Sequence, residues 1–155
     1  MAHSINTTTD TGDAPEPGRG AAHVTEEARQ AGRMYDDFRQ TGTPRVNLLL
    51  VGPEAVTQRA VTLVARDWDE PLLTWRPGEP FLFPALRPGG TLVLHNVGAL
   101  PPVDQLRLLA WLEVTAGRTR LISTTPRSLL PDVLDGTFID ALFYRLNTIC
   151  LKATD

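Results

Sequence analysis

The sequence has little of what marks a secreted, membrane or nucleic-acid-binding protein. It holds a single cysteine, Cys150, which we expect to be a small buried thiol in a reducing compartment. No apolar run is long enough for a transmembrane helix, and residues 1–19 contain no apolar signal segment. The formal net charge of −3 gives no basic footprint for nucleic acid. We therefore expect a cytoplasmic protein that binds neither a membrane nor DNA directly.

The side chains of metal and nucleophile chemistry are also scarce. His3 and His23 lie in the polar N-terminal stretch, and His95 has no Cys, Asp or Glu beside it, so we expect no metal site. Hydroxyls follow one another at 123–125, but no second histidine in the predicted folded region offers a general base. We expect that the chain is not an enzyme.

The length of 155 residues supports one domain with a sizeable core. Residues 1–24 are polar and rich in turn formers, which predicts a disordered N-terminal tail. Residues 25–42 are expected to hold an N-terminal helix, and residues 44–155 the folded core.

The N-terminal helix is predicted over 26–40, where Thr25 can cap it and two glutamates suit its positive end. One apolar stripe runs along it, and it either packs on the core or docks a partner. The stripe consists of Ala28, Ala31, Tyr35 and Phe38.

Strands and helices alternate through the rest of the chain, which predicts a doubly wound α/β layer. The continuous apolar run at 92–94 is typical of a parallel strand covered on both faces. In the helix near 103–115, Leu106, Leu109 and Leu112 are expected to face the sheet while Arg107 stays exposed. Strands are predicted near 45–51, 71–75, 91–96, 119–124 and 148–152. Helices are predicted near 54–67, 103–115 and 138–146, with a shorter turn at 128–134.

The most informative stretch is 90–98, Gly-Thr-Leu-Val-Leu-His-Asn-Val-Gly, followed by Leu-Pro, Gln105, a Leu-Leu pair and Leu-Glu. In order and spacing it resembles the Walker B region of sigma-54-dependent transcriptional activators, whose pattern is GTLFLDEIGDLP, then Q, LL and LE. The acidic pair of that pattern is replaced by His95 and Asn96. In P-loop ATPases the aspartate holds magnesium and the glutamate polarises the attacking water. A neutral imidazole and a carboxamide supply neither function, so the resemblance implies a chain without hydrolysis and without bound magnesium.

The first predicted strand runs into Gly52, where the resemblance places a P-loop of the form GxxxxGK[ST]. Thr57 stands at the second glycine and Gln58 at the lysine. Pro53 removes an amide donor, and Glu54 brings a negative charge toward the phosphate position. The segment is either a plain strand-to-helix turn or a degenerate nucleotide cradle.

Two further motifs follow the same family. In Arg-Leu-Ile-Ser-Thr-Thr-Pro, at 120–126, Thr125 matches the threonine of the sensor pair, but Pro126 occupies the sensor position. The stretch 136–147 resembles G-x-F-R-x-D-L-Y-Y-R-L-N. Ile139 replaces the first arginine, one of those that the family uses on a neighbouring subunit's nucleotide, while Arg145 keeps the second. Arg145 is either a structural partner on a helix face or a functional residue.

The family's GAFTGA loop, which touches the sigma factor, has no counterpart between Gly52 and His95. The sequence ends at Asp155, just after the fifth predicted strand, where the family continues into a helical lid and a DNA-binding helix-turn-helix.

The resemblance implies an α/β fold of the three-layer P-loop NTPase/AAA+ type, a parallel five-stranded sheet flanked by helices, without the helical lid. We expect a non-catalytic pseudo-ATPase, a regulatory or interaction protein in transcriptional control or signalling. Its expected partner is itself or a AAA+ relative, in a monomer or small oligomer rather than a hexamer, joined by the N-terminal helix stripe or the strand edge at 148–151. No cofactor is expected.

Two alternatives remain. The first is a switch that binds ATP or ADP without hydrolysis, and the second is an enzyme with new chemistry near Thr57, His95, Asn96 and Thr125. The vestigial nucleotide-site positions are Gly52, Thr57, Gln58, His95, Asn96, Thr125 and Arg145.

Overall fold

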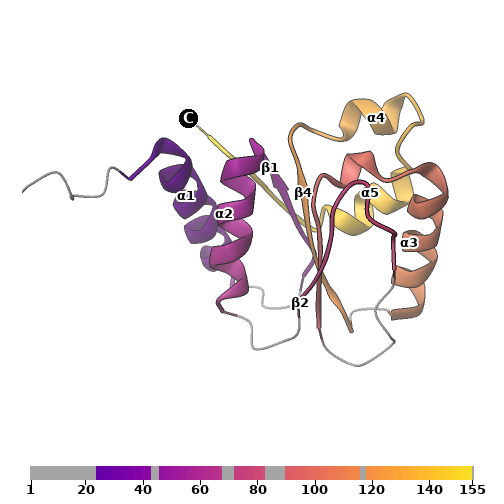
Figure 1. The fold of residues 1–155 in the computed structure, drawn as a ribbon, viewed down its shortest axis with the longest axis horizontal. Coiled ribbons are helices and arrows are strands. Elements are labelled where there is room, and N and C mark those ends of the chain that lie inside the picture. The colour runs from indigo at the N-terminus through magenta and orange to yellow at the C-terminus, as the bar shows by residue number, and fades with distance from the viewer. Residues whose placement is uncertain (1–23, 43–45, 68–71, 83–89, 116–117, 155) are drawn as a thin grey trace, which may run out of the picture.

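A parallel five-stranded sheet forms the centre of the molecule in the computed structural model, which describes residues 24–42, 46–67, 72–82, 90–115 and 118–154 (Figure 1). The strand order is β2-β3-β4-β1-β5, and every neighbouring pair is parallel. The predicted disordered tail at 1–24 lies outside the described residues except for Val24. The strands are β1 (Leu48–Val51), β2 (Leu72–Trp75), β3 (Thr91–Leu94), β4 (Arg120–Thr125) and β5 (Ile149–Lys152).

Helices cover both faces of the sheet, α1 and α2 on one side and α3, α4 and α5 on the other (Figure 1). Each face has its own apolar cluster, because alternate residues of the buried strands point to opposite sides. The predicted three-layer α/β architecture is confirmed. The helices are α1 (Glu26–Gln40), α2 (Glu54–Ala65), α3 (Pro102–Thr115), α4 (Leu130–Leu134) and α5 (Asp140–Leu146), with a short 3-10 turn, η1 (Val97–Ala99).

Helix α1 packs on the core beside α2. The Thr25 hydroxyl accepts a hydrogen bond from the Ala28 backbone N at 3.3 Å, which caps the helix as predicted. Ala31 and Met34 are buried in the same cluster as α2, and two other members of the predicted stripe pack partly against it. The stripe is therefore core packing, and it includes the buried Met34, which the predicted pattern omitted.

Helix α3 turns a different face to the sheet than predicted. Leu106 is 60% exposed, whereas Leu108 and Leu112 are buried and Leu109 is half-buried. The inward face includes Gln105, a buried polar residue that an apolar pattern does not select. The prediction for Leu106 is wrong because the buried side of α3 is formed by Gln105, Leu108, Trp111, Leu112 and Thr115.

Cys150 is exposed, so the prediction of a buried thiol is wrong. Strand β5 lies at the end of the strand order, and its residues alternate between half-buried and exposed. Ile149 and Leu151 pack against the α1–α2 side, which leaves Cys150 and Lys152 on the other face.

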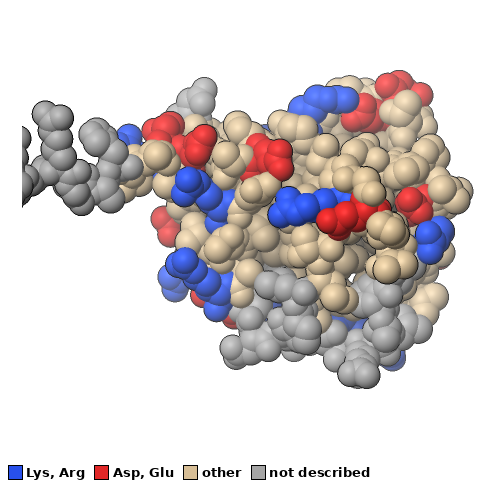
Figure 2. All heavy atoms as spheres, viewed as in Figure 1, with Lys and Arg blue, Asp and Glu red and all other residues tan. Residues whose placement is uncertain are grey.

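No helix among the described residues is long and apolar enough to cross a membrane. On the face seen in Figure 2, basic and acidic side chains are interspersed rather than gathered into one large patch of a single sign.

Candidate functional site

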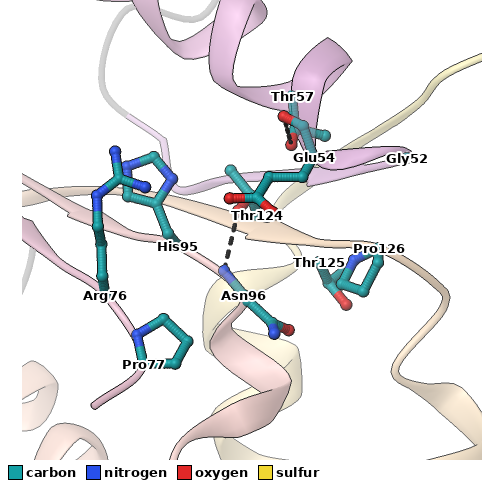
Figure 3. A pocket seen from close by; sticks show the side chains of 10 residues that line it. All are labelled: Gly52, Glu54, Thr57, Arg76, Pro77, His95, Asn96, Thr124, Thr125 and Pro126. Carbon is teal, nitrogen blue, oxygen red and sulfur yellow. Dashed lines mark hydrogen bonds between the residues drawn. The ribbon is translucent and has the colours of Figure 1, made fainter. Parts of the chain in front are cut away.

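A pocket of about 290 Å³ opens at the carboxyl ends of the central strands, the edge where open parallel sheets bind ligands. Five of the seven predicted positions line it: Gly52, Thr57, His95, Asn96 and Thr125. Figure 3 shows the side chains of Thr57, His95, Asn96 and Thr125 around the pocket, with Gly52 on the turn after β1. The complete lining is Gly52, Glu54, Thr57, Arg76, Pro77, His95, Asn96, Thr124, Thr125 and Pro126.

The segment expected at the P-loop position is the first turn of a helix. Pro53 precedes α2, which begins at Glu54 directly after the β1 turn. The backbone N–H groups of Val56 and Thr57 both donate to the Pro53 carbonyl at 3.0 Å. These amides are engaged within the helix, unlike those of a P-loop, which cradle phosphates. The geometry is that of a plain strand-to-helix turn.

Gly52 has a packing reason to be glycine. A Cβ atom built on Gly52 would lie 2.6 Å from the Ala153 Cβ. The chain after β5 is held there because the Ala153 N–H donates to the Val51 carbonyl at 2.8 Å. The Gly52 N–H donates to the Thr125 carbonyl at 3.0 Å, which ties the same turn to β4.

Gln58 does not line the pocket. Its Nε2 donates to Glu54 Oε1 at 2.7 Å, one helical turn earlier. The Glu54 carboxylate itself lines the pocket, as its position in the sequence predicted.

His95 is 7% exposed, and its backbone N–H donates to the Trp75 carbonyl at 3.0 Å. Burial, followed by the nearby Arg76 charge, lowers the pKa of His95 below its ordinary value, and the Glu54 and Glu79 carboxylates oppose that shift. His95 Nδ1 is buried and has no hydrogen-bond partner among the described residues. The imidazole is therefore neutral near pH 7.

Asn96 makes the sharp turn out of β3, with a left-handed backbone at φ 48° and ψ 60°. Asparagine adopts this conformation more readily than most residues, so the substitution at this position suits the turn. The Asn96 N–H donates to Thr124 Oγ1 at 3.0 Å, drawn as a dashed line in Figure 3. The Asn96 residue itself is exposed at the pocket.

The Thr125 hydroxyl of the sensor-like segment is also engaged in a hydrogen bond within its own segment. The Thr125 hydroxyl donates to the Arg127 carbonyl at 2.7 Å, while Pro126 is exposed on the pocket wall.

Arg76, directly after β2, also lines the pocket and was missed by the sequence analysis. Its position directly after a predicted parallel strand was the available signal.

Arg145 lies apart from this pocket. It lines a second cavity of about 270 Å³, whose other walls come from the end of α3 and from residues just before β1, β4 and β5. Asn47 supports that region, because its Nδ2 donates to the Arg145 carbonyl at 2.8 Å and its Oδ1 accepts from the Leu121 N–H at 3.2 Å. The structure does not bring Arg145 together with the other predicted positions of the same chain.

Gln105, the glutamine of the Walker B-like pattern, connects α3 to the segment before α5. Its Nε2 donates to the carbonyls of Leu100 at 3.0 Å and Thr137 at 3.1 Å. Its Oε1 accepts from the Ile139 N–H at 2.9 Å. Ile139, which replaces the family's first arginine, is half-buried and packs against the core.

Known proteins share the pattern of the second half of the chain. The family model described as the Sigma-54 interaction domain matches residues 85–152. The transcriptional regulatory protein ZraR of Salmonella typhimurium is 36% identical over 75 residues, which covers 41% of this chain and 17% of ZraR. The DNA-binding transcriptional regulator NtrC of Rhizobium meliloti is 35% identical over 75 residues, covering 41% of this chain and 16% of NtrC. The chain thus spans about a sixth of the length of these relatives.

Solved structures share the fold at low sequence identity. NtrX from Brucella abortus matches with a TM-score of 0.67 at 18% identity, over 83% of this chain and 39% of NtrX. NtrX in complex with ADP matches at 0.63, with 17% identity, over 85% of this chain and 36% of that chain. The P-loop NTPase domain of a sigma-54 activator from E. coli matches at 0.53 with 16% identity, over 83% of this chain and 96% of that domain. The chain therefore has the P-loop NTPase/AAA+ fold and resembles the Sigma-54 interaction domain of sigma-54-dependent transcriptional activators.

Proposed function

We propose that this chain is a non-catalytic regulatory protein, a pseudo-ATPase that retains the AAA+ fold as a surface for protein interaction. Its similarity to transcriptional regulators favours a role in transcriptional control or signalling, which would place it in the cytoplasm. Its partner would be a second copy or a AAA+ relative.

The observation that carries the proposal is the turn between β1 and α2. A working P-loop offers free amides and a lysine to the phosphates. In this chain the corresponding residues begin α2, with the Glu54 carboxylate lining the pocket and the Gln58 amide hydrogen-bonded to it. A phosphate entering the pocket would meet a like charge and lack the lysine.

The end of β3 supports the same conclusion for magnesium. His95 is buried and neutral, and Asn96 offers a carboxamide where the family pattern has an acid. Magnesium binds through carboxylates and substrate phosphates, and catalysis needs a group that positions water. No group of three or more possible metal-binding His, Cys, Asp or Glu side chains occurs among the described residues.

Steady-state phosphate release with magnesium and ATP tests the proposal. We expect no turnover above background, and none in the double variant His95→Asp/Asn96→Glu, because Gln58 still stands in place of the P-loop lysine. Turnover in the wild type that Asn96→Ala abolishes would refute the pseudo-ATPase.

A switch that binds ATP or ADP without hydrolysis is the second candidate, because the pocket stays open at the ligand-binding edge of the sheet. A ligand at a hundredfold excess over its Kd stabilises the native state by about 2.7 kcal/mol. For a chain of this size that is a melting shift of roughly 5–10 °C. We expect almost no shift with millimolar Mg-ATP. A clear shift that is lost in Gln58→Glu, but kept in the matched exposed control Gln40→Glu, would favour the switch.

Of the two self-association surfaces expected from the sequence, we propose the one at β5. The α1 stripe is packed against α2 and is not free to dock a partner. The remaining surface is the β5 end of the sheet, where Cys150 and Lys152 are exposed. We propose that a small oligomer would use this surface.

A further inference from the structure

The pocket at the carboxyl ends of the strands holds one charge of each sign. Of its ten lining residues, Arg76 and Glu54 are the ionised ones near pH 7, because His95 is neutral. Figure 3 draws the Arg76 side chain on the His95 side of the pocket and the Glu54 side chain descending from α2. Both charges lie near enough to His95 to influence its pKa in opposite directions.

Neither charge forms an ion pair with another described residue. Glu54 Oε1 accepts a hydrogen bond from the neutral Gln58 amide, which leaves the carboxylate charged. The carboxylate of Glu79 accepts from the backbone N–H of Arg76 at 3.1 Å and forms no ion pair with its guanidinium. The pocket thus presents a free cation and a free anion to solvent.

The remaining walls are neutral. Thr57 and Thr125 direct their hydroxyl protons to backbone carbonyls of their own segments, and Pro77 and Pro126 are apolar. Asn96 adds an exposed carboxamide that can donate or accept. No lining side chain therefore changes the balance of one positive and one negative charge.

We infer that this pocket binds a small zwitterion, whose carboxylate contacts the Arg76 guanidinium and whose ammonium group contacts the Glu54 carboxylate. Guanidinium groups bind carboxylates through paired, charge-assisted hydrogen bonds. A simple anion would satisfy Arg76 but meet Glu54, and a simple cation would satisfy Glu54 but meet Arg76, so complementarity selects a ligand with both charges. The volume of about 290 Å³ lies at the lower end for small-molecule sites, which suits an amino-acid-sized compound.

The inference does not depend on the proposed pseudo-ATPase, because it uses only the charges that the pocket presents. It adds a small-molecule ligand to the proposed regulatory function. A regulatory protein with such a pocket would respond to an amino acid or to another small molecule that carries both an amino and a carboxylate group.

A series of ω-amino acids tests the inference. Glycine, β-alanine, γ-aminobutyrate, δ-aminovalerate and ε-aminocaproate differ in the separation of their two charges, and each is titrated into the 15N-labelled full chain. Acetate and methylammonium serve as controls with a single charge. We expect one chain length to bind best, at least about tenfold tighter than either control, with shifts at the Gly52 and Asn96 amides. A factor of ten corresponds to about 1.4 kcal/mol.

Matched substitutions locate the site. Arg76→Gln and Glu54→Gln should each weaken binding of the best ligand at least about tenfold, while Arg66→Gln and Glu113→Gln, exposed and outside the pocket, should leave it unchanged. Melting curves check that all four variants fold.

Three results would overturn the inference: no member of the series binds, acetate binds as tightly as the best member, or the pocket variants bind like the wild type. Mg-ATP binding and turnover, measured on the same samples, test the proposed function separately, so that either idea can fail while the other holds.

Discussion

Replacing Gly52 by alanine should destabilise the fold although it adds only one methyl group. The new Cβ would lie 2.6 Å from the Ala153 Cβ, well inside van der Waals contact, and backbone hydrogen bonds fix both sides of the contact. Overpacking of this kind costs about 1–3 kcal/mol. For a chain of this length we expect the melting temperature to fall by roughly 2–12 °C.

Two further variants make the test specific. Gly32→Ala is the matched control, because nothing lies within 4 Å of the position and Gly32 is inside α1. Alanine in a helix interior is favoured over glycine by about 0.5–1 kcal/mol, so this variant should be more stable than the wild type. Ala153→Gly should rescue Gly52→Ala, since it removes the opposing methyl group.

Urea denaturation followed by circular dichroism gives the free energy of unfolding for the wild type and the four variants. The double variant Gly52→Ala/Ala153→Gly should lose at least about 0.5 kcal/mol less than the sum of its single variants, the coupling expected for residues in contact. If Gly52→Ala is as stable as the wild type, or if the two substitutions are additive, the packing explanation for this glycine is wrong.

Three other predictions concern Gln105, His95 and assembly. Gln105→Ala leaves three backbone groups without their partner and should cost about 2–4 kcal/mol in urea unfolding, whereas Gln40→Ala, exposed at the end of α1, should change stability by less than about 0.5 kcal/mol. Burial lowers the pKa of His95 in the folded state, so the unfolded chain takes up the proton first as the pH falls through about 6.5. Wild-type stability should therefore fall more steeply between pH 7 and 5 than that of His95→Gln, and parallel curves would contradict the buried neutral imidazole. Light scattering coupled to size exclusion should give a monomer or small oligomer with and without Mg-ATP, and a nucleotide-dependent hexamer would contradict the proposed assembly.

The order of the secondary-structure elements could be predicted because each carries a strong local signal. The apolar run before Gly52 and the one at 92–94 are typical of buried parallel strands, and both strands form within three residues of the predicted bounds. The Thr25 cap likewise fixed the start of α1. The errors arose where tertiary contacts override the pattern. Gln105 is buried because its side chain forms hydrogen bonds with three backbone groups, and Cys150 is exposed because it lies on the edge strand β5.

The position of the candidate site could be predicted from the sequence, but not all of its lining residues or their charges. A family pattern places Gly52, His95 and Asn96 at one edge of a sheet, and the structure brings them together. Arg76 could not be found in this way, since it belongs to no motif and reaches the pocket only because β2 pairs with β3. The neutral state of His95 depends on burial by residues that are distant in the sequence, so the sequence around His95 does not predict it.

The first turn of α2 bears on whether this chain could regain a phosphate loop. Val56 and Thr57 are each 1% exposed, and Val56 packs in the cluster beneath α1. Unwinding residues 54–57 into a loop would withdraw that valine from the interior, at a cost of about 1.5–3 kcal/mol before any ligand is bound. Point substitutions that restore the motif's side chains would therefore act on a backbone of the wrong shape. Reversion would require the first turn of α2 to unwind in addition to those substitutions.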